Sequence, residues 1–282
     1  LYKKKFNYIS IAKIIFGFVY AILPILIFKI SGLKDYSYLV ISHQLGLIIG
    51  LISIFFLLYR KSILNDFISL FAFKISNLIQ IMKKYKKYAL FSSPAAFMNT
   101  VSIWIPVIFI WIFFEEKYTS LFFLAHRAVN LPILLLGHSI GKIFYSEASL
   151  NLNEGTLNKS IIKYFKILVH IAVPFLFLSL FLSQDLFNAI YSSEWAEAGN
   201  IIQILSPWLF FTFLASPIST IPTILYKQEF EFKFQLVLLI IRISALMVGT
   251  IILSDVFLTL VLFSLGSALA WMVYLFFILK MS

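Results

Sequence analysis

The chain of 282 residues contains no cysteine, and only 12% of its residues are charged. The lack of cysteine excludes disulfide bonds and thiolate metal ligands. The low charge excludes an ordinary soluble domain, in which about 25% of residues are charged and about 45–50% are apolar. Here 61% of residues are hydrophobic, and the mean hydropathy is +0.97. These values indicate an integral membrane protein, whose basic unit is a helix of about 20 apolar residues.

Apolar stretches of that length recur along the whole sequence. They do not alternate apolar and polar residues, as the strands of a membrane barrel would. We therefore predict an all-α integral membrane protein with about eight transmembrane helices. The predicted spans lie near residues 8–30, 37–59, 95–114, 118–141, 161–183, 199–225, 234–253 and 256–279.

The net charge of +11 comes mainly from lysines in short connections between these stretches. This distribution follows the positive-inside rule and does not indicate nucleic-acid binding. With the N-terminal residues in the cytoplasm, most basic residues fall on the cytoplasmic side. The opposite side is weakly acidic and carries Asp35, Glu115, Glu116, Asp185, Glu194, Glu197 and Asp255. The sequence thus predicts a multi-pass protein with basic cytoplasmic connections.

One connection, residues 61–94, is much longer than the others. Its apolar residues recur at helical spacing, and it carries a basic cluster at Lys83, Lys84, Lys86 and Lys87. We expect an amphipathic helix on the inner membrane surface. It is either a link between two helical lobes or a basic topology anchor. The chain then divides into residues 1–60, the linker 61–94, and residues 95–282.

Two arginines lie deep inside predicted spans, where a charge costs about 2.5–3.5 kcal/mol. Arg127 shares a helix face with Asn130 and His138, Arg242 is near the middle of its span, and Asn99 lies on a further polar stripe. No acidic residue lies at comparable depth. We expect both arginines to face one hydrated cavity. The alternative is that each pairs with a carbonyl or carboxylate and locks helices together. Prolines in several spans are typical of the broken helices of transporters.

Enzyme signatures are missing from the sequence. It has no metal-ligand cluster, glycine-rich phosphate loop, nucleophile elbow or pair of carboxylates within a span. The four histidines are scattered, and we expect most to make ordinary polar contacts. The sequence therefore favours a protein that is not an enzyme and that carries no cofactor.

Four segments resemble a known family. They are "YKKYALFSSPAAFMNTVSIWIPVIFI" (85–110), "LAHRAVNLPILLLGHSIGKIFYSEAS" (124–149), "YSSEWAEAGNIIQILSPWLFFTFLASPISTI" (191–221) and "YKQEFEFKFQLVLLIIR" (226–242). In order and spacing they are similar to signatures of the O-antigen and capsule flippases. That family belongs to the multidrug/oligosaccharidyl-lipid/polysaccharide exporter superfamily.

The resemblance implies two lobes of six helices. Residues 1–60 would be the last two helices of the first lobe, 95–282 would be the second lobe, and an N-terminal part would be missing. The implied activity is alternating-access flipping of an undecaprenyl-diphosphate-linked oligosaccharide across the bacterial cytoplasmic membrane, driven by proton or sodium exchange. The implied cavity residues are Arg127, Arg242, Asn130, His138 and Asn99. Alternatives are a peptidoglycan-precursor flippase, a drug exporter or, from another class, a membrane-embedded polysaccharide polymerase.

Overall fold

The computed structural model describes residues 75–281, apart from 154 and 192. Before residue 75 it describes only helical residues 17, 18, 22, 25, 26, 41, 44–49 and 52. The spans predicted near 8–30 and 37–59 therefore lie largely outside the described residues. Contacts divide the chain into two units, Leu1–Lys84 and Tyr85–Ser282. The second unit thus begins before residue 95, where the sequence places the start of the second lobe.

In the first unit, helix α4 covers Ile75–Lys84 and ends with Lys83 and Lys84. Two basic residues in the last turn are favourable, because the last turn of a helix carries unsatisfied carbonyl groups. This helix falls within the predicted linker, and its helical conformation agrees with the spacing of apolar residues there. Its location at a membrane surface stays a prediction.

The second unit is built from helices throughout, and no strand occurs among residues 75–281 as described. In chain order its elements are η1 (Tyr88–Ser92), α5 (Ser93–Phe113), α6 (Glu116–Asn153), α7 (Leu157–Phe177), η2 (Leu178–Leu182), α8 (Ser183–Tyr191), η3 (Ser193–Trp195), α9 (Ala196–Ala215), α10 (Ile221–Ile224), α11 (Gln228–Met247), η4 (Val248–Leu253) and α12 (Val256–Lys280).

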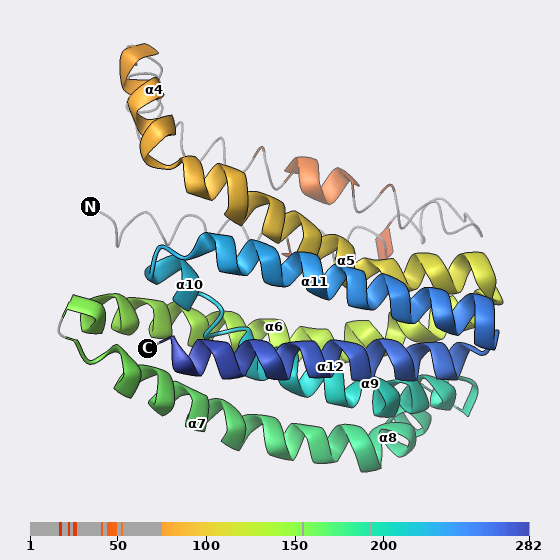
Figure 1. Cartoon of the computed structure of the whole chain (residues 1–282). Helices are drawn as coiled ribbons and strands as arrows, with labels where there is room; N and C mark the ends of the chain where they lie inside the picture. The colour runs from red at the N-terminus through yellow and green to blue at the C-terminus, as the bar shows by residue number, and fades with distance from the viewer. Residues whose placement is uncertain are drawn as a thin grey trace. The chain divides into compact units, whose positions relative to one another are not determined.

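Helix α9 lies at the centre of this unit. It packs against α6, α7, α8 and α12, while α11 packs against α5 and α12. Figure 1 shows the long helices of the unit running side by side, with α12 in front of α9. Ile201 and Leu205 of α9 are completely buried. The core therefore surrounds α9, and the other helices present one face to it and one face outward.

Six stretches of the described residues are long and apolar enough to cross a membrane. They are Tyr88–Phe113, Glu116–Leu152, Leu157–Tyr191, Ser193–Ala215, Gln228–Leu253 and Val256–Lys280. The prediction of an all-α fold with membrane-length helices is confirmed for this part of the chain. Several predicted helix ends were wrong, because hydropathy locates the apolar central segment of a helix but not the residues at which the helix begins and ends. Helix α6, for example, runs on to Asn153 instead of ending near residue 141.

The prediction of one span over 199–225 was also wrong. Helix α9 ends at Ala215, residues 216–220 form turns, and the short helix α10 follows. Pro217 lies within this break and Pro222 lies in the first turn of α10, and each lacks the N–H that a continuing helix needs. Tyr226 then adopts a positive φ of 56° before α11 begins. Prolines 106, 132, 174 and 207 lie inside helices that continue past them.

The two ends of the unit differ in charge. The end with the α6–α7 connection, α10 and the C-terminus carries lysines, including Lys159, Lys227 and Lys280. The opposite end, with the α5–α6 connection, α8 and the start of α12, is richer in acids (Figure 1). This segregation agrees with the sequence pattern. Which end faces the cytoplasm stays a prediction.

Candidate functional site

Helix α6 presents two different faces. Leu121, Phe122, Ala125 and Val129 are buried and pack into the core. Arg127 is exposed on another side of the same helix. The 3.6-residue period of the helix explains the separation, because positions 121, 125 and 129 fall together while 127 points away. The local sequence therefore directs the arginine out of the core.

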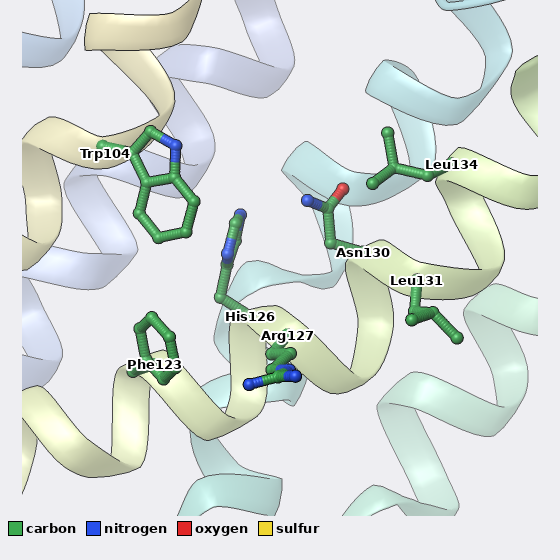
Figure 2. A pocket seen from close by; sticks show the side chains of 7 residues that line it. All are labelled: Trp104, Phe123, His126, Arg127, Asn130, Leu131 and Leu134. Carbon is green, nitrogen blue, oxygen red and sulfur yellow. The ribbon is translucent and has the colours of Figure 1, made fainter. Parts of the chain in front are cut away.

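Two adjoining cavities share Arg127 and Phe123. The first, about 250 Å³, lies between α5 and α6 and is lined by Trp104, Phe123, His126, Arg127, Asn130, Leu131 and Leu134. Figure 2 shows these side chains, with Trp104 and His126 turned toward each other and Asn130 one turn further along α6. The second, about 610 Å³, extends toward the acidic end of the unit and is lined by Trp111, Glu116, Thr119, Ser120, Phe123, Leu124, Arg127, Tyr191 and Trp195.

The guanidinium of Arg127 has no ion-pair or hydrogen-bond partner among the described residues. Glu116 lines the larger cavity with it, but the two residues are eleven positions apart on α6, or about 16 Å along the axis. A cation without an internal partner, placed in a cavity, can bind an external anion. Asn130 adds an amide that can donate or accept a hydrogen bond beside it.

His126 forms one wall of the smaller cavity, although it was not among the predicted site residues. It is 3% exposed and stacks between Phe122 and Trp208, with ring centroids 5.9 Å apart in each case. Trp104 meets it edge-on at 5.5 Å. Phe122 lies one helical turn before His126, so that contact can be predicted from the sequence. The contact with Trp208 cannot, because nothing in the sequence places residue 208 beside α6.

Arg242 lies in the core and not in either cavity. It is 1% exposed, and its Nε donates to Ser267 Oγ at 2.9 Å while an Nη donates to Ser102 Oγ at 2.6 Å. Its guanidinium also lies 5.0 Å from the ring centroid of Trp208 and 5.2 Å from that of Phe263. Arg242 thus joins α5, α9, α11 and α12. This agrees with the alternative prediction that the arginine locks helices together, except that its partners are serine hydroxyls and aromatic rings and not a carbonyl or carboxylate.

The remaining predicted site residues lie outside both cavities. His138 is exposed on α6, on the face of Arg127 but eleven residues further along. Asn99 is half-buried on α5 and lines neither space. The structure therefore brings together Arg127 and Asn130, with His126 and Trp104 as additional residues. It does not bring Arg127 and Arg242 into one cavity.

The outer surface and the interior of the unit have the composition of a membrane protein. Large apolar side chains are exposed, among them Trp111, Leu135, Phe181 and Ile252. Polar residues such as Ser102, Ser206 and Ser264 are buried. Water would penalise that apolar surface, whereas lipid tails accept it. The fold and surface therefore define a multi-pass α-helical membrane protein. Comparison with family models, curated proteins and solved structures found no match.

Proposed function

We propose that the chain functions in moving an undecaprenyl-diphosphate-linked oligosaccharide across the bacterial cytoplasmic membrane, and that the cavities at Arg127 hold the diphosphate. The observation that carries the proposal is an arginine within a membrane-length helix, which lines two cavities and has no partner in the part of the chain that the structure describes. The resemblance of four sequence segments to polysaccharide flippases supports the same function.

The chemistry of the cavity residues suits a diphosphate. The planar guanidinium of Arg127 can bind two phosphate oxygens at once, and such charge-assisted hydrogen bonds are about twice as strong as neutral ones. Inside a membrane the bond gains further strength, because the surrounding dielectric is low. Asn130 can donate from its amide to a third oxygen.

The larger cavity suits a glycan attached to that diphosphate. Trp111, Tyr191 and Trp195 line it with aromatic rings, and Thr119 and Ser120 add hydroxyls. Sugars combine apolar C–H faces with hydroxyl edges, so an aromatic wall with a few polar groups can accept different sugars. The lipid part would stay in the bilayer beside the exposed apolar surface of α5 and α6.

The test is a pair of substitutions at Arg127 in the full-length protein of its host. Arg127→Ala removes both the charge and the guanidinium group that can bind two phosphate oxygens. Glycan export should therefore fall at least about tenfold, which corresponds to a loss of about 1.4 kcal/mol in binding free energy or in transition-state stabilisation. Arg127→Lys keeps the charge without the bidentate geometry, so export should be intermediate. Membrane abundance should stay normal in both variants, because the exposed side chain supports no packing.

Lys142→Ala is the matched control. Lys142 is an exposed cation on the same helix, outside both cavities, so its loss should leave export unchanged. Normal export by Arg127→Ala would show that the arginine does not serve the substrate. Export of drugs or peptidoglycan precursors, with lipid-linked oligosaccharides left unmoved, would assign the protein to another transporter class.

A further inference from the structure

A second polar cluster lies where α11 meets α12, apart from the cavities at Arg127. The carboxylate of Glu231 accepts a hydrogen bond from Gln235 Nε2 at 2.9 Å and one from the Tyr274 hydroxyl at 2.7 Å. Tyr274 is completely buried. The rings of Phe230 and Phe234 lie 5.7 Å and 4.3 Å from the Tyr274 ring. A carboxyl group is therefore held against an aromatic wall within a membrane-length helix.

No cation neutralises this carboxylate among the described residues. The other charged side chains of the elements that pack around this part of α11 are Lys86, Lys87, Lys227, Glu229, Lys233 and Lys280. Lys87 pairs with the exposed Glu229 at 3.4 Å, and Lys280 lies over the ring of Phe276 at 4.3 Å. Glu231 is half-buried, and its two hydrogen bonds come from neutral groups. A carboxylate held away from water without a cation is unfavourable, and binding a proton or a cation relieves that cost.

Neighbouring amides lack hydrogen-bond partners that an added proton could supply. Gln228 is 1% exposed, yet neither its Nε2 nor its Oε1 has a partner among the described residues, and Gln235 Oε1 has none there either. Residues 228 and 235 are three before and four after Glu231, so all three share one face of α11. Both unpartnered amide oxygens are acceptors. A carboxylic acid at position 231 has one O–H, which can donate either to an amide oxygen on this face or to the Tyr274 oxygen, whereas a carboxylate has none.

The Tyr274 hydroxyl is placed between two acceptors. It lies 2.7 Å from Glu231 Oε2 and 3.5 Å from the backbone oxygen of Ser219. While Glu231 is ionised, its carboxylate is the stronger acceptor and takes the tyrosine proton in its hydrogen bond. When Glu231 is protonated, its own O–H can donate to the tyrosine oxygen, and the tyrosine O–H is then free to donate to Ser219.

From this geometry we propose that Glu231 is a reversible proton-binding site whose state is passed by Tyr274 to the 216–220 break. One proton adds to the Glu231 carboxylate, and no other bond is made or broken. The hydrogen bond between Tyr274 and the Ser219 carbonyl strengthens when that proton is bound. This proposal does not rest on anion binding at Arg127.

The break is well placed to pass the change onward, because it rests on α6. A Cβ added at Gly137 would lie 3.3 Å from Ser216 Oγ, and one at Gly141 would lie 3.4 Å from Pro217 Cα. These two glycines let the break approach the helix closely. A movement of residues 216–220 would therefore press directly on α6, the helix that carries Arg127.

Infrared difference spectroscopy of the purified full chain in lipid tests the proton site. As pH falls, the carbonyl band of a protonated carboxylic acid should appear in an apolar position. Glu231→Gln should remove that band, whereas the control Glu229→Gln, at an exposed residue on the same helix, should leave it. A band that persists in Glu231→Gln, or a carboxylate that never protonates over the stable pH range, would overturn the proposal.

Hydrogen exchange measured by mass spectrometry tests whether protonation of Glu231 affects the 216–220 break. After correction for intrinsic exchange, protection of residues 216–227 should rise several-fold through the same pH step. Tyr274→Phe should abolish that rise while keeping the carboxylic-acid band, and Glu229→Gln should keep both. A pH-independent exchange pattern in the wild-type chain would refute the link to Ser219. Since Tyr274→Phe loses only a hydroxyl, it keeps the test decisive even if Glu231→Gln fails to fold.

Discussion

Replacing Arg242 by alanine should destabilise the fold, in contrast to the same change at Arg127. The side chain is 1% exposed and donates to Ser102 and Ser267. Hydrogen bonds to a charged group contribute about 1.5–3 kcal/mol each. The contacts with the rings of Trp208 and Phe263 add about 0.5–2 kcal/mol. Against these stands the desolvation of a guanidinium, which costs several kcal/mol.

These opposing contributions largely cancel, so the change in the free energy of unfolding depends mainly on the cavity that the missing side chain leaves. Truncating a large buried side chain to alanine costs about 2–5 kcal/mol when the site cannot collapse. We therefore expect Arg242→Ala to lower the free energy of unfolding by about 2–4 kcal/mol. Arg242→Met keeps most of the volume and removes the buried charge, so it should lie within about 1 kcal/mol of the wild type.

The assay is reversible unfolding in mixed micelles, followed by tryptophan fluorescence. The chain has five tryptophans, so the fluorescence follows unfolding of the whole unit, and Trp208 beside Arg242 is one of its sources. Arg127→Ala is the control and should change stability by no more than about 0.5 kcal/mol, as for other exposed positions. Equal stability of Arg242→Ala and the wild type would contradict a structural role for Arg242. A methionine variant as unstable as the alanine variant would show that packing is not the deciding term.

Two further predictions concern close packing and access to water. A Cβ at Gly199 would collide with Gln184 Cα and lie 2.7 Å from its backbone nitrogen, so Gly199→Ala should cost about 1–3 kcal/mol in unfolding free energy. Gly137→Ala, which meets only Ser216 Oγ at 3.3 Å, should cost less, and equal losses would contradict the close α8–α9 approach. Because the chain has no cysteine, Asn130→Cys should react with a membrane-impermeant thiol reagent, whereas Phe177→Cys, exposed outside both cavities, should not. Thiolates form in water and not in lipid, so equal labelling would show that the cavity is dry.

Much of the fold follows from the sequence, because long apolar runs can satisfy their backbone only as helices in a membrane. The run 256–279 matches α12, Val256–Lys280, almost residue for residue. There Asp255 caps the helix, accepting from the Leu258 N–H at 2.7 Å. The run 199–225 misled because the break at 216–220 is polar but carries no charged residue, and apolar residues resume directly after it. The two prolines there were visible, but prolines at 106, 132, 174 and 207 lie inside unbroken helices.

The cluster at Glu231 also shows that hydropathy does not locate helix ends or partners that are distant in sequence. The sequence begins the predicted span at 234, since Glu231 and Lys233 interrupt the apolar run. In the structure α11 begins at Gln228, and Glu231 lies inside the helix with Tyr274 as its partner. The two residues are 43 positions apart. Hydropathy excludes such a residue from a span, although an amide of the same helix and a hydroxyl of the next helix donate hydrogen bonds to it there.

The two intramembrane arginines show why a polar stripe alone does not define a site. Both have small or polar residues at helical spacing, so their sequence environments predict the same hydrated surroundings. Their surroundings differ because Arg242 meets Ser102 and Ser267, short side chains that leave room for a guanidinium and accept its hydrogen bonds. Arg127 meets the cavities beside Trp104 and Trp111, where no described acceptor reaches it. A charge within a membrane-length helix is thus structural when its neighbours complete its hydrogen bonds, and it is free to bind a ligand when they do not.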